Sequence, residues 1–304
     1  MEYKFLKNGF KVSTVSFGCM SLKPSGTDND ALIAKAIDNG INLFDTADLY
    51  DKGDNEILLG KALKGKRNDV FVSTKVGNKW RPDGSGWDWT PRKEYILTAV
   101  DDSLRRLGTD FIDLYLLHGG TIEDPIDEVI EAFERLKDSG KIRSYGLSSI
   151  RPNVIKEFVK RSDITAVMTQ YSLLDRRPEE ETLELLRENN IGVLARGALA
   201  SGLLAGKPAK SYLGLEEEQV KAIQDGLSQH LPAGYTSGVT ALRYVIYRKA
   251  VTSAVVGIRT ENQLNEALRA TIQSPLTPQQ REVLQGIWEG NRCLLYTSPS
   301  PRDG

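Results

Sequence analysis

The chain has 304 residues, with 40 basic and 41 acidic side chains and a formal net charge of −1. This balance excludes a dedicated nucleic-acid-binding surface, and no apolar run approaches the roughly 18 residues that a membrane-spanning helix needs. The N-terminus lacks a signal-peptide pattern, and two cysteines, Cys19 and Cys293, cannot form a disulfide framework. We therefore expect a cytoplasmic protein that is a monomer or a small homo-oligomer and has no nucleic-acid or membrane partner.

Apolar runs typical of strands alternate along the chain with segments in which apolar residues recur every three or four positions. An N-terminal hairpin is predicted over residues 3–12, with a two-residue turn at Asn8-Gly9. Strands are predicted at 14–19, 41–44, 70–74, 112–117, 142–147, 166–170, 192–195 and 253–256. Helices are predicted at 29–38, 55–63, 92–107, 126–139, 151–160, 179–189, 237–249 and 262–270, with an extra C-terminal helix over 277–289.

Eight strands, each followed by a helix, predict an α/β fold consisting of a single (β/α)8 TIM barrel. An open doubly wound sheet is the alternative, but the GxGxxG sequence expected after its first strand is not found there. We expect one domain over 1–292 and a non-native tail over 293–304. The letters CLLYTSPSPRD of this tail resemble the translation of a sequencing-library adapter, the alternative being a disordered Pro/Ser-rich segment.

Polar residues follow three successive predicted strands. Asp45 follows the second strand, Lys75 the third and His118 the fourth, while Tyr50 lies in the loop after the second strand. Each has a simpler interpretation alone: a helix cap for Asp45, a solvent-exposed lysine for Lys75 and a buried core histidine for His118. Because the carboxyl ends of barrel strands meet at one mouth, which carries the active site in such barrels, the convergence favours a catalytic group.

The four residue types suit the protonation of a carbonyl oxygen. An ammonium at Lys75 favours the phenolate form of Tyr50, and Asp45 keeps Lys75 charged and oriented. His118 can donate a hydrogen bond to a substrate carbonyl oxygen, so the group predicts general-acid chemistry with electrostatic assistance. A hydride must then come from a cofactor. With two histidines and no HxxxH or CxxC spacing, no metal site is expected.

The long connection WRPDGSGWDWT over residues 80–90 contains three of the four tryptophans, Trp80, Trp87 and Trp89. An ordinary surface loop with a covered aromatic is one interpretation. Three large aromatic side chains in a glycine-broken loop favour the other, a loop that faces the substrate.

These segments, taken in order, resemble the aldo-keto reductase superfamily over roughly residues 1–290. The matching segments are SFGCMSL at 16–22, NLFDTADLY at 42–50, STK at 73–75, DLYLLH at 113–118, GKIRSYGLSS at 140–149, SGLLAGK at 201–207 and GIRTENQL at 257–264. The resemblance implies that Tyr50 is the proton donor, that Lys75 and Asp45 tune it, and that His118 orients the carbonyl.

The resemblance also implies a nicotinamide cofactor, NADP (as NADPH) rather than NAD. The implied contacts to its carboxamide and nicotinamide ring are Ser148, Ser149, Gln170 and Arg196. The implied contacts to its pyrophosphate and adenosine are Gly197, Leu199, Ser201, Gly257, Arg259, Gln263 and Glu266. Arg259 matches the basic residue that pairs with the 2′-phosphate of NADP, a role that suits a planar guanidinium. The family often has Asn at the positions of Ser149 and Ala267, and an aromatic residue at that of Arg196.

The implied activity is the reversible, NADPH-dependent reduction of an aldehyde or ketone to its alcohol, with the proton coming from Tyr50. The alternative is an NADPH-binding regulatory or redox-sensing protein with little turnover, as in the potassium-channel β subunits of the same superfamily. An isomerase or lyase on the same barrel is a third possibility, disfavoured because no metal or phosphate signal accompanies it. The partner is expected to be a small-molecule carbonyl or alcohol, and its identity is not encoded in any motif.

Overall fold

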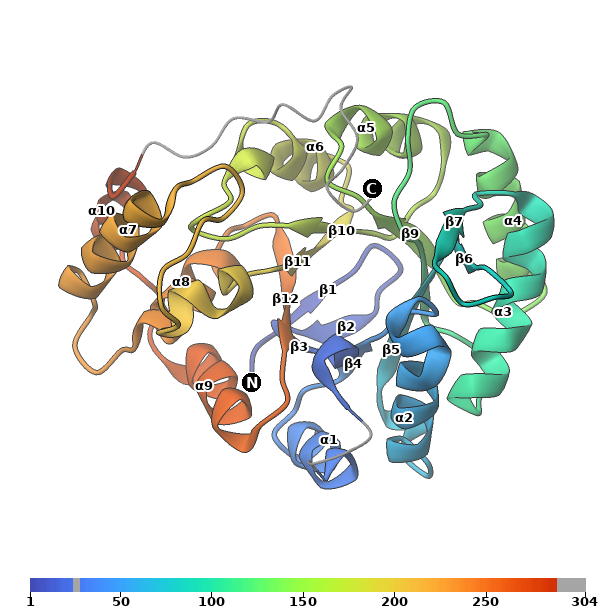
Figure 1. Ribbon diagram of the computed structural model, residues 1–304, viewed down its shortest axis with the longest axis horizontal. Helices are drawn as coiled ribbons and strands as arrows, with labels where there is room; N and C mark the ends of the chain where they lie inside the picture. The colour runs from blue at the N-terminus through green and yellow to red at the C-terminus, as the bar shows by residue number, and fades with distance from the viewer. Residues whose placement is uncertain (24–27, 289–304) are drawn as a thin grey trace.

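The computed structural model describes residues 1–23 and 28–288, and eight parallel strands in it close into a barrel (Figure 1). Neighbouring strands follow chain order around the barrel, and the last pairs with the first, so the predicted (β/α)8 fold is confirmed. The barrel strands are β3 (Val15–Gly18), β4 (Leu43–Asp45), β5 (Phe71–Val76), β8 (Leu114–Leu117), β9 (Tyr145–Ser148), β10 (Ala166–Gln170), β11 (Gly192–Arg196) and β12 (Val251–Gly257).

Eight helices follow the strands and cover the outside of the barrel (Figure 1). They are α1 (Asn29–Asp38), α2 (Asp54–Ala62), α3 (Lys93–Leu107), α4 (Ile126–Asp138), α5 (Pro152–Arg161), α6 (Thr182–Glu188), α8 (Ser237–Ile246) and α9 (Glu261–Ile272). Two further helices, α7 (Glu217–Gln229) and α10 (Pro278–Gly286), lie side by side at one edge of the molecule. The helix α7 was not predicted. No helix among the described residues has the length and apolarity needed to cross a membrane.

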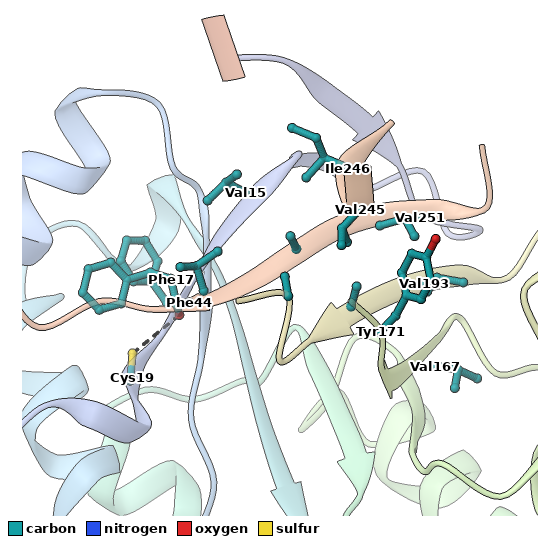
Figure 2. Packing of buried hydrophobic residues seen from close by; sticks show 14 of the residues in the cluster. Val15, Phe17, Cys19, Phe44, Val167, Tyr171, Val193, Val245, Ile246 and Val251 are labelled. Carbon is teal, nitrogen blue, oxygen red and sulfur yellow. Dashed lines mark hydrogen bonds between the residues drawn. The ribbon is translucent and has the colours of Figure 1, made fainter. Parts of the chain in front are cut away.

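Alternation along the strands separates an inner core from an outer one. In β8, Leu114 and Leu116 point into the barrel, while Tyr115 and Leu117 pack against the surrounding helices. Figure 2 shows part of the outer core, where Phe17 and Phe44 from neighbouring strands stack with ring centroids 5.5 Å apart. The rigid barrel that results presents its strand ends in fixed positions, which is what an active site built on those ends requires.

The N-terminal hairpin consists of β1 (Tyr3–Phe5) and β2 (Lys11–Ser13) and lies across one end of the barrel. Its predicted two-residue turn is wrong. The amide of Leu6 donates to the carbonyl of Phe10, and the amide of Gly9 donates to the carbonyl of Leu6, both at 2.9 Å. This is a three-residue connection with Gly9 at φ +85°, the left-handed position that such a connection assigns to glycine.

The segment predicted as a loop over residues 80–90 forms most of a second hairpin, β6 (Asn78–Trp80) and β7 (Trp87–Trp89). Smaller differences concern element ends. The helix expected from residue 179 begins at Thr182, after a 3-10 turn at Arg177–Glu179, and the strand expected from residue 142 begins at Tyr145. Ile142 retains a single bridge to Ile112. The predicted tail over 293–304 lies outside the described residues.

Candidate active site

The four polar residues predicted to converge do lie together at the carboxyl end of the barrel. Asp45 is the last residue of β4 and pairs with Ser73 in β5, two positions before Lys75. His118 directly follows β8, and its amide donates to the carbonyl of Val76 at 2.7 Å. Lys75 in turn pairs with Leu116, two positions before His118, so the three side chains lie at the ends of three neighbouring strands, each two residues farther along than the one before.

Lys75 and Asp45 form a buried ion pair, with relative exposures of 0 and 4%. The Nζ of Lys75 donates to both carboxylate oxygens of Asp45 at 2.8 Å and to the carbonyl of Thr46 at 2.6 Å. Ser73 donates a further hydrogen bond to Asp45 at 2.5 Å. Burial by itself lowers the pKa of Lys75, but the charges and hydrogen bonds of Asp45 and Tyr50 outweigh it, so the pKa lies above its ordinary value. Lys75 is therefore an ammonium at neutral pH.

Tyr50 begins a 3-10 turn, Tyr50–Gly53, that folds back over this pair. The Nζ of Lys75 lies 5.0 Å from the centroid of the Tyr50 ring, and the His118 ring meets the same ring edge-on with centroids 5.9 Å apart. Asp51 and Lys52, directly after Tyr50, both have left-handed backbones, with φ of 47° and 58°. Two such residues in succession are costly for L side chains, so the surrounding contacts must hold the turn in place.

Two residues under this turn were missed from the sequence. Asn55 and Glu56, in the first turn of α2, are polar and yet fully buried. The available signal was their position, because both lie on the same side of α2 as the buried Leu59. Glu56 also affects its surroundings: burial, and then the negative charge of Glu56, raise the pKa of the Asp48 carboxyl well above its usual range.

A cavity of about 810 Å³ runs from Tyr50 along the carboxyl ends of β10, β11 and β12 to the start of α9. The predicted site residues that line it are Asp45, Tyr50, Gln170, Arg196, Gly197, Leu199, Ser201, Gly257, Arg259, Gln263 and Glu266. The predicted residues outside its lining are Lys75, His118, Ser148, Ser149, Trp80, Trp87 and Trp89. Lining residues that were not predicted include Met20, Ile150, Arg177, Tyr212 and Leu213. An elongated cavity of this size can hold a dinucleotide beside a small substrate.

The middle of the cavity is bordered by a tight turn over residues 197–202 that contains several left-handed residues. Ala200, Ser201 and Gly202 are successive left-handed residues, with φ of 46°, 58° and 94°, and Gly197 is a fourth at 70°. Lys207 adds an ammonium that donates to the carbonyl of Ser201 at 2.7 Å. The amides of Ala200 and Gly202 donate to the carbonyls of Gly197 and Leu199 at 2.8 Å, so they are bonded within the turn. The cation of Lys207 is the group beside the turn that suits a pyrophosphate.

The inner end of the cavity contains an amide that is held from several sides. The Oε1 of Gln170 accepts from Arg196 at 2.5 Å, and its Nε2 donates to Asp175 at 3.0 Å and to the Tyr212 hydroxyl at 3.3 Å. Ser148 and Ser149 are buried at the end of β9. Gln170 and Arg196 are adjacent strand-end residues in register, so their proximity follows from the pairing of β10 with β11.

The outer end of the cavity lies at the N-terminus of α9. The amide of Arg259 donates to Gln263 at 3.0 Å, and the amide of Gln263 donates to the capping hydroxyl of Thr260 at 3.3 Å. The side chain of Arg259 is exposed, while Glu266 accepts a hydrogen bond from Thr236 at 2.7 Å. A helix N-terminus with an arginine beside it suits a phosphate group.

The three tryptophans lie on the β6–β7 hairpin, outside the cavity lining. The indole N–H of Trp89 donates to both oxygens of Asp124, at 3.0 and 3.1 Å, and its ring covers Gly119. Trp80 faces the Nζ of Lys52 at 5.2 Å, so the hairpin contacts the turn that carries Tyr50. The described residues include no group of three or more metal-ligating side chains.

The sequence model of the Aldo/keto reductase family matches residues 14–289 of the chain. The chain is 46% identical over 283 residues to the uncharacterized oxidoreductase YqkF of Bacillus subtilis (strain 168), a match that covers 90% of this chain and 92% of YqkF. It is 32% identical over 256 residues to the NADH-specific methylglyoxal reductase of Escherichia coli (strain K12), covering 76 and 78% of the two chains. Among solved structures, the holo form of aldo-keto reductase AKR11C1 from Bacillus halodurans superposes with a TM-score of 0.91 at 44% identity, covering 98 and 100%.

Proposed function

Since the chain belongs to the aldo/keto reductase family and is an oxidoreductase, we propose that it uses NADPH to reduce an aldehyde or ketone to the alcohol, reversibly. The observation that carries the proposal is the position of the Tyr50 ring. It lies 5.0 Å from a buried ammonium, with His118 beside it, at one end of the 810 Å³ cavity. A phenol beside a fixed positive charge is suited to donate a proton to a substrate oxygen.

Each of the four residues has one role in the proposal. Tyr50 transfers its hydroxyl proton to the carbonyl oxygen, and the Lys75 ammonium stabilises the phenolate that remains. Asp45 holds that ammonium through the two 2.8 Å hydrogen bonds. His118 donates a hydrogen bond to the same carbonyl oxygen and so fixes the direction from which the substrate approaches Tyr50.

The cavity lining fits the cofactor that this chemistry needs. A bound nicotinamide supplies the hydride that adds to the carbonyl carbon. We propose that the turn at 197–202, with Lys207 beside it, holds the pyrophosphate and that Arg259, Gln263 and Glu266 hold the adenosine end. Ser148, Ser149, Gln170 and Arg196 would surround the nicotinamide. One relative is named NADH-specific, so the preference for NADPH rests on Arg259 at the end of the cavity.

The substrate side of the site is proposed to lie between Tyr50, His118 and the β6–β7 hairpin. Lys52 connects the Tyr50 turn to Trp80 and to the carbonyl of Gly84, at 3.4 Å. The apolar faces of Trp80, Trp87 and Trp89 would then border the non-reacting part of a carbonyl substrate.

The proposal is tested by following the oxidation of NADPH with a panel of aldehydes and ketones, using the parent protein and Tyr50→Phe. We expect turnover by the parent and a loss of kcat of about 10²–10⁴-fold in Tyr50→Phe, the range over which a positioned general acid contributes. NADPH binding, measured by fluorescence titration, should be unchanged because the phenylalanine ring keeps the packing. Tight NADPH binding without turnover of any carbonyl by the parent would contradict the proposal and favour a regulatory protein.

A further inference from the structure

The carboxylate of Glu56 is buried in the first turn of α2, which directly follows the turn that carries Tyr50, and the proposed reaction gives it no part. Its exposed fraction is 0%, the same as that of its neighbour Asn55. An ionised carboxylate without solvent is costly unless it is paired and fully hydrogen-bonded. The partners of Glu56 therefore determine what its burial does for the molecule.

One oxygen of Glu56 reaches the strand that carries Lys75. Its Oε1 accepts a hydrogen bond from the hydroxyl of Thr74 at 2.6 Å, and Thr74 is buried next to Lys75 in β5. In a strand, neighbouring side chains point to opposite faces, so Thr74 points outward to α2 while Lys75 points inward to Asp45. Glu56 thus fixes the outer face of β5 where its inner face carries the ammonium.

The other oxygen reaches the turn that carries Tyr50. The Oε2 of Glu56 accepts a hydrogen bond from the Nε of Arg106 at 2.6 Å, and Arg106 also donates to Ser103 at 3.2 Å. The side chain of Arg106 packs under Gly53, where an added Cβ would lie 2.6 Å from its Cδ. Gly53, at φ +93°, closes the strained turn that begins at Tyr50.

Asn55 strengthens the same connection from the neighbouring position. Its Nδ2 donates to the carbonyl of Cys19 at 2.8 Å, and its Oδ1 accepts from the hydroxyl of Thr46 at 2.8 Å. The carbonyl of Thr46 is in turn one of the three acceptors of Lys75. The first turn of α2 is therefore bonded to β5 and to the residue after β4, and through Arg106 it packs against the end of the Tyr50 turn.

We infer that Glu56 is a positioning residue that, through Thr74 and Arg106, holds the phenol of Tyr50 and the ammonium of Lys75 at their working separation. The inference rests on the proposed function, in which these two groups act together. Tyr50 and Lys75 belong to different segments, a strained turn and a strand, and Glu56 contacts a partner in or against each. Its negative charge is needed because Arg106 is a cation that packs against the backbone of the turn.

A matched buried carboxylate exists at the opposite end of the same strand. Asp113 is also fully buried and accepts hydrogen bonds from Arg67 at 2.7 Å, from Arg143 at 2.8 Å and from the amide of Val72 at 2.9 Å. It therefore anchors the start of β5, far from Lys75. Asp113 lies directly before β8, so Asp113→Asn removes a buried negative charge beside the start of β5 without changing a residue of the proposed site.

The first measurement compares Glu56→Gln with Asp113→Asn, using 4-nitrobenzaldehyde and NADPH. Both variants should unfold at lower urea concentrations than the parent, because each leaves arginines without their carboxylate. At equal folded fraction, kcat of Glu56→Gln should fall about tenfold or more, since small displacements of reacting groups have effects of that size. Its KM and its NADPH dissociation constant should stay within about twofold, and Asp113→Asn should keep the parent kcat.

The second measurement does not depend on turnover. With 3-fluorotyrosine in place of Tyr50, the fluorine resonance of Glu56→Gln should shift or split relative to the parent, while that of Asp113→Asn should coincide with the parent. If Glu56→Gln does not fold, Thr74→Val takes its place in the comparison, because this variant removes the hydroxyl that donates to Glu56. A resonance that does not move, or that moves equally in the Asp113 control, overturns the inference. If the parent turns over no carbonyl at all, the proposed function fails, and the resonance still decides the role of Glu56.

Discussion

Lys75 shows at the scale of single residues how a buried charge is retained. Its ammonium has no exposed surface, and two oxygens of Asp45 with the carbonyl of Thr46 accept its hydrogen bonds. Because the pKa of Lys75 is raised, its contribution to stability is complete at neutral pH and is lost only as the pH rises through the folded-state pKa. The pair is thus a constant feature of the site over the neutral range.

Arg259 provides the residue-scale prediction for cofactor preference. Arg259→Ala should raise the dissociation constant of NADPH about 10- to 100-fold, because a charge-assisted hydrogen bond to a phosphate is lost, and should leave that of NADH unchanged. Fluorescence titration of both cofactors measures this. Arg269→Ala is the control, since Arg269 lies on α9, which Arg259 precedes, and its guanidinium donates to the carbonyl of Gly234 at 3.0 Å. An unchanged ratio of NADPH to NADH affinity in Arg259→Ala would refute the assignment.

Some residues of the site could be predicted from the sequence and others could not. The convergence of Asp45, Lys75 and His118 was predictable because strand ends in a barrel meet at one mouth, and the structure confirms that they meet. Their catalytic roles remain predictions. The helical position of Glu56 indicated its burial, but not its link to the site, because Thr74 and Arg106 are distant in the chain and become its neighbours only after folding.

At the scale of elements, the ends of a helix were predicted correctly where the sequence contains a capping residue or a terminal glycine. The helix α1 has the predicted bounds, and the side chain of Asp28 caps it by accepting from the amide of Ala31 at 3.0 Å. The helix α3 ends at Leu107, before Gly108 at φ +62°. The helix α7 was missed although Val220, Ile223 and Leu227 have helical spacing, because it stands outside the strand–helix repeat.

The N-terminal hairpin gives the element-scale prediction, through Lys4 in β1. The ammonium of Lys4 donates to the carbonyls of Ile246 and Val251 at 2.7 and 2.6 Å, which joins the hairpin to the barrel. Burial lowers the pKa of Lys4 to about 8, with Glu2 opposing the shift and Arg281 adding to it. In the unfolded chain the pKa of Lys4 has its ordinary value of 10.5. Between pH 8 and 10.5 the unfolded chain therefore binds more protons than the folded one, so stability rises with pH across that window.

Lys4→Met lacks this titration. The parent should therefore gain stability relative to Lys4→Met as the pH rises from 7 to 10.5. The difference between their free energies of unfolding should grow by up to about 3 kcal/mol over this range. Urea denaturation across this range measures the difference. Lys11→Met, at an exposed position on β2, serves as the control. A difference that does not vary with pH would show that Lys4 is not desolvated.

At the scale of the whole molecule, the barrel is closed by pairing of β12 with β3, and α10 covers residues near the end of β10. The indole N–H of Trp288 donates to the carbonyl of Leu173 at 2.7 Å, and Arg176 donates to the carbonyls of Gln285 and Trp288 at 3.0 and 3.1 Å. The match to the family ends at residue 289, close to these contacts. We propose that the folded domain ends at about residue 292.

Two shortened chains test this domain boundary. A chain that ends at residue 292 should unfold at the same urea concentration as the parent, because it keeps Trp288 and its contacts. A chain that ends at Gly286 should lose about 2–3 kcal/mol of unfolding free energy, since it loses the apolar contacts of Ile287 and Trp288 and the indole hydrogen bond. A marked loss of stability in the longer of the two chains would show that residues 293–304 belong to the domain.

The sequence by itself determined the barrel, the order of its eight strands and their helices, and the four residues at its mouth. These features depend on apolar periodicity, on glycine and capping residues, and on the rule that the carboxyl ends of parallel barrel strands lie at the same mouth. Each of these signals is local in the sequence or recurs with every strand–helix unit. Only the tertiary structure decided that the tryptophans form a hairpin outside the cavity and that Glu56 supports Tyr50 and Lys75. It also showed that Lys75 is fully buried and that the carbonyl of Thr46 joins Asp45 in accepting its hydrogen bonds. The physical reason is that desolvation and hydrogen-bond partners arise from side chains far apart in sequence, and no local pattern records which of them will meet.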